Sequence, residues 1–496
     1  MNEPRKSDGP IVPTKSPNKA GQPAAEVAEG RGSTEGNTGE QNALRTQRRV
    51  GAPSALDRVR QVARRDKNVR FTALFHHITI DRLRAAFLSL EKRAAPGIDG
   101  VTWEQYRAGL EENLRALHER LHRGAYRAKA SRRVFIPKPD GRQRPLGIAA
   151  LEDKIVQRAV VEVLNAIYEV DFLGFSYGFR PTRSQHQALD ALAVAFLRNK
   201  VNWVLDADVR GFFDAIDHGW LMKFLEHRIA DRRVLRLIQK WLSAGVLHDG
   251  TWSAGAVGTP QGATISPLLA NVYLHYVFDL WIQQWRSRHA QGAVSVVRFA
   301  DDFIVGFQRE SDARRFLAEL RERLRKFSLE LHPDKTRLIR FGAFAALNRQ
   351  ERGEGKPETF DFLGFTHICG RTRDRRFLLL RHTIARRMRA TLHAVKAALM
   401  KRRHDPVPAQ GRWLGSVVRG YFAYYAVPTN SEKLAAFRTQ VLRAWLHALR
   451  RRSQRDQTTW ERVSHLADRW IPRARVQHPW PNERFDVRTR GRSPVR

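Results

Sequence analysis

The chain is poor in cysteine, with Cys369 as its single thiol among 496 residues. One cysteine cannot form an internal disulfide, and it cannot supply the paired thiolates of a C-x-x-C zinc site. No stretch reaches the roughly 18 consecutive apolar residues of a membrane-spanning helix. The N-terminus also lacks the apolar run of a signal peptide. We therefore expect a soluble, cytoplasmic protein with no membrane contact and no disulfide partner.

Acidic residues are also scarce relative to basic ones. The chain has 50 Asp and Glu against 88 Lys and Arg, which gives a formal net charge of +38. Solubility alone requires much less charge than this. Such a surplus makes a compact chain repel itself unless a polyanion lies nearby. Nucleic acid is the expected partner, because each neutralised phosphate releases a counterion. In a prokaryotic cell, the protein would then associate with the nucleoid.

Composition and periodicity divide the chain into five expected segments. Residues 1–54 have almost no large apolar side chains and should form a disordered polar and basic tail. A helical extension follows at residues 55–125, where Leu110, Leu114, Leu117 and Leu121 recur at helical spacing. The remaining segments are an α+β body at 126–370, a basic helical domain at 371–470 and a basic tail at 471–496.

Local patterns place the expected elements within these segments. An Asp140-Gly141 turn should join a hairpin across residues 134–148, and the segments 294–299 and 303–307 should form a second hairpin. Residues 203–209 have the pattern of a strand. Ser266 followed by Pro267 predicts an N-cap and the start of a helix. Beyond about residue 370 we expect no strands, only the helices 383–403, 411–425 and 432–451.

Two acidic segments lie in apolar surroundings. On the strand expected at residues 203–209, Asp206 and Asp208 should share one face, opposite the apolar residues. Asp301 and Asp302 should lie at the tip of the second hairpin. Carboxylates at strand ends suit magnesium, which prefers oxygen ligands. Each segment alone has a simpler interpretation, because Asp-Asp commonly forms turns and alternating acids commonly mark a solvated strand face.

The order of several motifs resembles that of reverse transcriptases, and more narrowly that of group II intron-encoded proteins. The general series comprises Asp208-x4-Phe213, Gly258-Thr-Pro-Gln261-Gly262, Phe299-Ala-Asp301-Asp302 and Leu331-His-Pro-Asp-Lys335-Thr. The narrower series comprises Pro96–Gly100, Arg144–Ile148, Leu151–Lys154, Gly174–Pro181, Ser266–Asn271 and Gly415-x4-Gly420-Tyr421-Phe422-x-Tyr424-Tyr425. Any one motif is weakly specific, whereas the ordered set, which runs from about residue 55 to the C-terminus, is very specific.

This resemblance implies an α+β right-hand polymerase with fingers and palm at 126–370 and an α-helical thumb, or maturase, domain at 371–470. The implied activity is RNA-directed DNA synthesis with two Mg²⁺ ions, or Mn²⁺ as an alternative. The implied partners are group II intron RNA, target DNA, a primer and deoxynucleoside triphosphates. The implied roles are assistance to splicing and intron mobility by target-primed reverse transcription.

The resemblance also implies roles for individual residues. Asp208, Asp301 and Asp302 match the metal-binding catalytic carboxylates, whereas Asp206 lies outside the motif and is expected to be structural or to support them. Phe213 matches a steric gate, which selects deoxynucleotides because its ring would clash with a 2′-hydroxyl.

Further nucleotide contacts are implied on both sides of the expected site. Lys138 and Arg144 match fingers residues that hold the triphosphate, Gln261 matches a glutamine beside the nucleotide, and Lys335 matches a palm lysine near the leaving pyrophosphate. In the basic helical domain the expected RNA contacts are Arg386, Arg387, Arg389, Tyr421, Tyr424 and Tyr425, since basic residues interleaved with aromatics suit RNA. The tail at 471–496 is a candidate DNA contact.

The sequence departs from the usual family pattern in a few places. Phe299 replaces the usual Tyr, Ala263 replaces a Gly, the tail at 1–54 has no counterpart, and no Cys/His nuclease module is recognisable, as in endonuclease-lacking members. Three alternatives remain open: a reverse transcriptase of another lineage, a non-catalytic RNA chaperone with the same fold, and a basic DNA-packaging protein. The last explains the charge but not the motifs.

Overall fold

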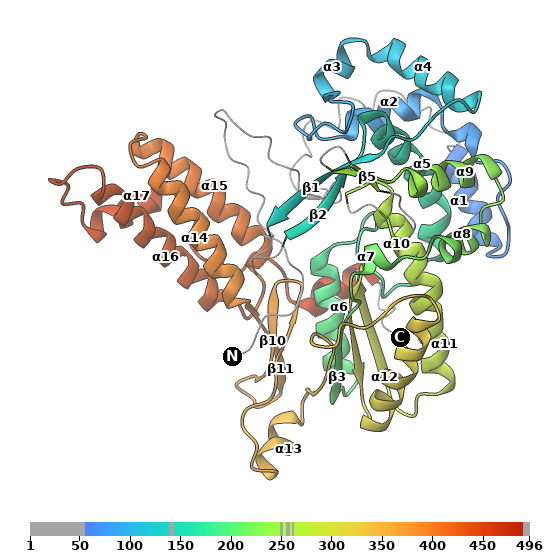
Figure 1. Cartoon of the computed structure of the whole chain (residues 1–496). Coiled ribbons are helices and arrows are strands. Elements are labelled where there is room, and N and C mark those ends of the chain that lie inside the picture. The colour runs from blue at the N-terminus through green and yellow to red at the C-terminus, as the bar shows by residue number, and fades with distance from the viewer. Residues whose placement is uncertain (1–54, 138–142, 249–250, 254–257, 260–261, 490–496) are drawn as a thin grey trace.

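The computed structural model describes residues 55–137, 143–248, 251–253, 258–259 and 262–489 (Figure 1). The expected tail at 1–54, the Asp140-Gly141 turn and two expected nucleotide contacts, Lys138 and Gln261, lie outside these residues. Of Arg144 only the backbone is described. Three small sheets and the helices around them form the α+β fold that the sequence predicts, and its parts are called fingers, palm and thumb below.

The N-terminal extension is helical, as the sequence predicts. It contains α1 (Ala55–Arg65), the short 3₁₀ helix η1 (Phe75–His77), α2 (Ile80–Ser89), α3 (Trp103–Ala108) and α4 (Leu110–His122). The predicted leucine face of α4 is confirmed, since Leu114, Leu117 and Leu121 are buried. Thr102 begins α3 with a capping box, in which its side chain and that of Gln105 satisfy each other's backbone N–H groups.

The fingers contain a four-stranded sheet with the order β2-β1-β4-β5. Its strands are β1 (Ser131–Pro137), β2 (Gln143–Ile148), β4 (Val246–His248) and β5 (Thr251–Ser253). Strands β1 and β2 pair antiparallel with Arg132 opposite Ile148, which confirms the predicted hairpin. Strand β4 comes from a segment about a hundred residues later and pairs parallel to β1.

The palm contains a second four-stranded sheet, with the order β6-β7-β3-β8. Its strands are β3 (Trp203–Asp208), β6 (Val294–Phe299), β7 (Asp302–Phe307) and β8 (Arg337–Arg340). Strands β6 and β7 form the second predicted hairpin, which is also confirmed. All pairs in this sheet are antiparallel. Strand β3 pairs with β7 on one side and with β8 on the other.

Helices cover both faces of the palm sheet (Figure 1). One face packs against α10 (Ser266–Leu274), the π-helix η2 (His275–Asp279), α11 (Leu280–Arg288) and α12 (Glu310–Arg325). The opposite face packs against α6 (Gln185–Arg198). The prediction of Ser266 as an N-cap was wrong by one residue: Ser266 is the first residue of α10 and Ile265 is the cap.

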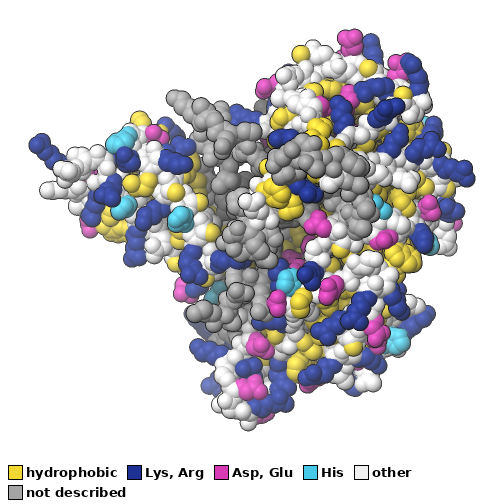
Figure 2. All heavy atoms as spheres, viewed as in Figure 1, with side chains coloured by type: hydrophobic (Ala, Val, Ile, Leu, Met, Phe, Trp, Pro, Cys, Tyr) yellow, Lys and Arg dark blue, Asp and Glu magenta, His cyan; other side chains and the backbone are white. Residues whose placement is uncertain are grey.

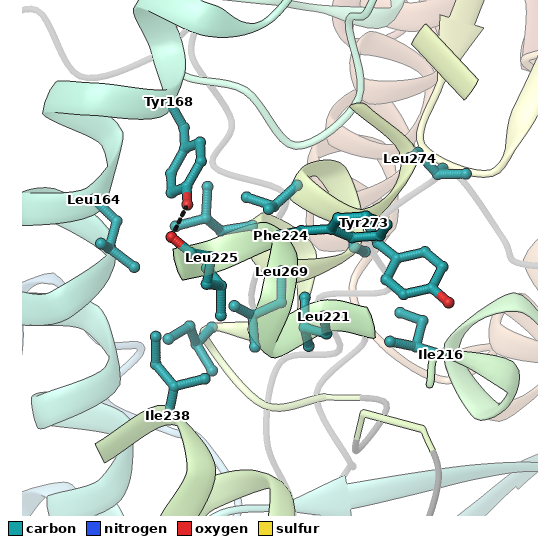
Figure 3. Close-up of a cluster of buried hydrophobic side chains, with 14 of the residues drawn as sticks. Leu164, Tyr168, Ile216, Leu221, Phe224, Leu225, Ile238, Leu269, Tyr273 and Leu274 are labelled. Atoms are coloured by element: carbon teal, nitrogen blue, oxygen red, sulfur yellow. Dashed lines mark hydrogen bonds between the residues drawn. The ribbon is translucent and has the colours of Figure 1, made fainter. Parts of the chain in front are cut away.

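An apolar core joins the fingers to the palm (Figure 3). It contains residues from α5 (Leu151–Asp171), α8 (His218–Glu226), α9 (Arg232–Ser243) and α10. Tyr168, Leu225, Ile238 and Leu269 are buried there. The Tyr168 hydroxyl donates a hydrogen bond of 3.5 Å to the Leu225 carbonyl oxygen. This core gives the short helix α7 (Phe212–Ala215) and the end of β3 a rigid support.

The connection to the thumb corrects one expectation. Strands do not stop at residue 370, because β9 (Phe360–Phe362), β10 (Phe365–Arg371) and β11 (Phe377–Thr383) form a third antiparallel sheet. The small helix α13 (Ala345–Glu351) precedes this sheet. The three predicted thumb helices are confirmed as α14 (Ala385–Lys401), α15 (Val407–Tyr425) and α16 (Ser431–Arg450), with α17 (Trp460–Trp470) beside them.

The C-terminal segment, expected to be an irregular basic tail, contains a helix that returns to the palm. Helix α18 (Pro481–Thr489) packs against α6. Arg484 Nε lies 2.5 Å from Asp190 Oδ2, and Asp190 Oδ1 lies 3.3 Å from Arg381 Nη1. Asp190 therefore bridges the palm, the third sheet and the C-terminal helix at a buried position.

Candidate active site

Two predicted catalytic carboxylates lie directly opposite each other in the palm sheet. Asp208, the last residue of β3, is the register partner of Asp302, the first residue of β7. Asp301 lies immediately before Asp302, as the second residue of the two-residue loop that joins β6 to β7. Asp208 and Asp302 are 9% and 8% exposed. Asp208 lies more than 90 residues before the adjacent pair Asp301 and Asp302 in the sequence, and the strand register brings the three acids to one end of the sheet.

The strand alternation also agrees with the sequence prediction. Leu205, Ala207 and Val209 belong to the core on the α10–α12 side of the sheet, whereas Val204 belongs to the core on the α6 side. Because side chains alternate along a strand, Asp206 and Asp208 share the α6 side. Asp206 is 2% exposed, and its carboxylate lies 3.8 Å from Arg337 Nη2.

Lys335 approaches the same group of acids. Its Nζ lies 3.1 Å from Asp208 Oδ2, and both side chains are largely buried. The Lys335 backbone is placed by the preceding segment, where the His332 N–H donates to the Asp208 carbonyl oxygen at 2.8 Å. Sequence reasoning placed this lysine near the leaving pyrophosphate, and the structure adds its direct ion pair with a predicted metal ligand.

The acids suit a divalent cation in chemical type and in position. Carboxylate oxygens at a strand end and a tight turn are the ligands that Mg²⁺ takes from proteins. However, no three His, Cys, Asp or Glu side chains within the described ranges already form a metal-binding group. Since Lys335 neutralises Asp208, a cation at this position would replace its ammonium group as the counter-charge.

The predicted steric gate lies beside this end of the sheet. Phe213 is in α7, partly buried, with its ring 5.5 Å from that of Phe212. Its carbonyl oxygen accepts a hydrogen bond of 2.8 Å from the Thr259 N–H. The Gly258 N–H donates to the Ile216 carbonyl oxygen at 2.9 Å. The start of the Gly258–Gly262 motif is therefore held against the Phe213 turn.

The end of the same motif contacts the fingers. Gly262 has φ +110°, and a Cβ at this position would lie 2.9 Å from the Gly147 carbonyl oxygen. Only glycine combines this backbone conformation with such a close approach. Strand β2, which contains Arg144, thus adjoins Gly262. The side chains of Lys138, Arg144 and Gln261 lie outside the described residues.

Comparison with known proteins identifies the family. The model of the reverse transcriptase (RNA-dependent DNA polymerase) family matches residues 136–367, which include every acid discussed above. Protein YkfC of Escherichia coli is 36% identical, over 55% of this chain and 81% of its own length. The group II intron-encoded protein LtrA of Lactococcus lactis is 34% identical over 47% of this chain, and an uncharacterised 91 kDa protein in the cob intron of Schizosaccharomyces pombe is 42% identical over 32%.

The chain belongs to the reverse transcriptase family. LtrA, which is named for a group II intron, and the cob-intron protein place it with the intron-encoded reverse transcriptases and maturases, and its enzymatic class is RNA-directed DNA polymerase. The matched region covers 39% of LtrA and 19% of the fission-yeast protein. No helix in the described part of this reverse transcriptase is both long and apolar enough to cross a membrane.

The thumb of this reverse transcriptase corrects part of the predicted RNA surface. Tyr421 and Tyr425 are 0% and 2% exposed, so they are core residues rather than RNA contacts. The Tyr421 ring stacks on Phe437 with centroids 3.6 Å apart. Tyr424 is partly exposed, and its hydroxyl donates to the Leu363 carbonyl oxygen at 2.8 Å. The helical spacing of the three tyrosines placed two of them on the buried face of α15.

The predicted basic contacts remain at the surface. Arg386 and Arg387 are partly exposed at the start of α14, and Arg389 is exposed. Figure 2 shows Lys and Arg side chains distributed over the thumb helices on this side of the molecule. Their exposure is compatible with contact to phosphate groups.

Sequence reasoning missed a buried polar cluster behind the β6–β7 hairpin. It consists of Arg298 on β6, Asn271 on α10 and Asp279 in the π-helix, which are 0%, 1% and 0% exposed. The signal was present in the sequence, because an arginine interrupts the apolar run of residues 294–299. Charged residues are almost never fully buried unless they are paired, so this position required a partner that local pattern could not identify.

Proposed function

We propose that this reverse transcriptase copies RNA into DNA at the end of the palm sheet, with Asp208, Asp301 and Asp302 as its metal-binding catalytic residues. Two Mg²⁺ ions, or Mn²⁺ in their place, would activate the primer 3′-hydroxyl and neutralise the triphosphate when bound. The observation that carries this proposal is the register of β3 and β7, which sets Asp208 opposite Asp302 and next to the turn containing Asp301.

The surroundings of the acids support a deoxynucleotide substrate. Phe213 lies on the turn that follows β3, where its ring would meet the 2′-hydroxyl of a ribonucleotide. We assign the triphosphate to Lys138 and Arg144 of the fingers and the base side to Gln261, because the described parts of β2 and of the Gly258–Gly262 motif adjoin each other. A guanidinium group binds phosphate through two donors, and an ammonium group acts as a point charge.

Lys335 would supply a positive charge on the opposite side of the site. Its ammonium group pairs with Asp208 at 3.1 Å. When a cation neutralises Asp208, the lysine is released from this pair and can interact with charge developing on the leaving pyrophosphate. The lysine would thus exchange Asp208 for the pyrophosphate as its partner, so that binding of the cation frees the lysine for the leaving group.

The second part of the proposal concerns intron RNA and mobility. The net charge of +38 and the surface arginines of α14 favour a phosphate backbone as the partner of the thumb. Relatives named for introns, among them the group II intron-encoded protein LtrA, favour an intron as the bound RNA, whose folding for splicing the protein would assist. Reverse transcription primed at the target DNA would then support mobility, with residues 471–496 as a candidate DNA contact.

The polymerase assignment is tested by Asp301→Ala. We expect loss of cDNA synthesis in a primer-extension assay, whereas RNA binding in a filter-binding assay should remain close to that of the parent protein. Asp374→Ala is a matched control, because Asp374 also lies in a hairpin turn but is exposed and distant from the palm acids in the fold. Full polymerisation by Asp301→Ala would refute the assignment.

The intron assignment needs a different measurement. RNA that co-purifies with the protein should be sequenced after crosslinking in cells. We expect enrichment of an RNA that folds as a group II intron, and Arg386→Ala combined with Arg387→Ala and Arg389→Ala should reduce that enrichment. Recovery of bulk cellular RNA without an intron would contradict the assignment but leave the polymerase intact.

A further inference from the structure

The turn that contains Asp301 has an unfavourable backbone conformation. Ala300, the first residue of the two-residue loop, has φ 57°, in the left-handed region. A non-glycine residue pays roughly 1–2 kcal/mol for this conformation. Turns of this length with positive φ at the first position usually contain glycine there. Contacts from the surrounding structure must therefore hold the loop in place.

One such contact comes from the side chain of Arg298, two residues before the loop. Its Nη1 donates to the Ala300 carbonyl oxygen at 3.0 Å and to Asn271 Oδ1 at 2.9 Å. Its Nε and Nη2 donate to the two carboxylate oxygens of Asp279 at 2.7 and 2.5 Å. A bidentate pair of this kind fixes the plane of the guanidinium group. Asp279 thus aims one Arg298 nitrogen at the peptide between Ala300 and Asp301.

A second contact holds the loop from the segment that follows α5. Asn271 Nδ2 donates to the Gly178 carbonyl oxygen at 2.7 Å. Gly178 lies so close to the loop that a Cβ on it would be 3.0 Å from the Ala300 Cα and nearer still to its nitrogen. The Tyr177 N–H also donates to the Arg298 carbonyl oxygen at 2.8 Å. Asn271 therefore connects the guanidinium group to the backbone on the other side of the loop.

Stability alone is a weak reason for this cluster. Replacing a buried ion pair by apolar side chains of similar volume is often neutral or stabilising, whereas removing one partner is strongly destabilising. A cluster whose every charged group is fully buried, and whose remaining donor reaches the catalytic loop, is better explained by the geometry it imposes. Small displacements of such a loop matter, because catalytic groups must be held within about 0.5 Å of their working positions.

We propose that Arg298 is a positioning residue which, aligned by Asp279 and Asn271, fixes the Ala300 carbonyl and so sets the orientation of Asp301 for divalent cations. This inference rests on the proposed metal-binding role of Asp301. Asp279 acts through Arg298, Asn271 acts through Arg298 and through the Gly178 carbonyl, and none of the three is expected to touch the nucleotide. Removal of the cluster should therefore weaken cation binding without altering the apparent affinity for primer–template.

The test is the double variant Arg298→Met with Asp279→Leu, which removes both charges together. Its matched control is Arg228→Met with Asp171→Leu. That pair is also buried, at 2.8 Å, and the Arg228 guanidinium likewise donates to a backbone carbonyl, that of Val69, at 2.8 Å. The control pair ties the N-terminal extension to α5 rather than holding the catalytic loop.

We expect the half-saturating Mg²⁺ concentration of the test variant in primer extension to rise about 10- to 100-fold, as for loss of groups that orient metal ligands. The control variant should stay within about twofold of the parent protein, whatever its change in melting temperature. Mn²⁺ binding, measured by electron paramagnetic resonance on protein with a 3′-deoxy-terminated primer–template and deoxynucleotide, should weaken in parallel. The KM for primer–template should not change.

Asn271→Leu, which has a similar volume, provides a second variant should the double variant not fold. It should shift the Mg²⁺ and Mn²⁺ dependence in the same direction. Unchanged cation dependence in a folded test variant would overturn the inference, as would an equal shift in the control. Asp301→Asn separates failure of this inference from failure of the proposed function. If this variant leaves Mn²⁺ binding intact, the proposed metal-binding role of Asp301 itself fails.

Discussion

Gly178 offers a direct test of how precisely the catalytic loop must be placed. A Cβ at this position would lie 2.9 Å from the Phe299 carbonyl carbon, whereas ordinary contact begins at 3.4 Å. In Gly178→Ala the loop or the turn that contains Gly178 must therefore move by about 0.5 Å or more, which reaches the tolerance of a catalytic constellation. The obstacle is backbone, so no flexible side chain can absorb the displacement.

The expected effect on catalysis exceeds the effect on stability. Inserting a methyl group into a well-packed site costs about 1–3 kcal/mol, which urea unfolding would measure. A displacement approaching 1 Å in a reacting group can reduce the rate about 100-fold. We therefore expect Gly178→Ala to lower the single-nucleotide incorporation rate by about 10- to 100-fold in rapid-quench experiments at saturating Mg²⁺, primer–template and deoxynucleotide.

Gly355→Ala serves as the control, since a Cβ at this exposed position has no neighbour within 4 Å. It should retain the parent rate and unfolding free energy. If Gly178→Ala were destabilised but incorporated nucleotides at the full rate, the close packing against the loop would serve only the fold. That result would refute the argument that the position of the Asp301 turn limits catalysis.

Four further predictions follow from particular contacts. Phe213→Ala should raise the ratio of ribonucleotide to deoxynucleotide kcat/KM about 10- to 100-fold, because removing a clash of about 1–3 kcal/mol corresponds to a change of that size. An unchanged ratio would exclude Phe213 as the steric gate. Lys335→Met should lower kcat about 100-fold at saturating Mg²⁺, while Mn²⁺ binding without nucleotide should strengthen, since Asp208 loses a competing cation. Burial lowers the pKa of His275 to about 4, whereas the unfolded value is about 6.5, so only the unfolded chain binds this proton between those values. The unfolding free energy should therefore fall by about 2 kcal/mol because of this histidine when the pH is lowered from 7 to 5. In His275→Leu the unfolding free energy, measured with urea at the two pH values, should fall by less. Arg484→Ala removes one partner of buried Asp190 and should lower the unfolding free energy by about 1–3 kcal/mol and increase hydrogen exchange across residues 481–485; unaltered exchange would contradict the docking of α18.

Elements with a strong local signal could be predicted from the sequence. The hairpins expected at 134–148 and 294–307 have short apolar runs on either side of a turn signal, and both are confirmed. The shared face of Asp206 and Asp208 could also be predicted, because side chains alternate along a strand. The ordered motifs then indicated that the two segments belong to one site, which periodicity alone could not establish.

Errors arose where tertiary packing decides between two uses of the same residue. The pattern of aromatic residues in α15 is compatible with an RNA-binding surface and with a helix core. Tyr421 is in the core because α16 supplies Phe437 as its stacking partner. Strand β11 was missed because its partner β10 precedes it across a boundary placed by composition. Helix α18 has little apolar periodicity of its own, and its position depends on Asp190, almost 300 residues earlier.

The candidate site shows why the order of the motifs along the chain predicts the site better than any single motif does. Asp208 and Lys335 are 127 residues apart in sequence, yet their side chains are in contact. Loop closure over such a distance is entropically costly, so the contact requires the whole palm sheet, with β8 antiparallel beside β3. Arg298 and Asp279 are only 19 residues apart, but their contact depends on the π-helix and on the packing of α10 against the sheet. Residues of the candidate site could therefore be proposed from motifs, whereas the residues that hold them in place became identifiable only from the folded chain.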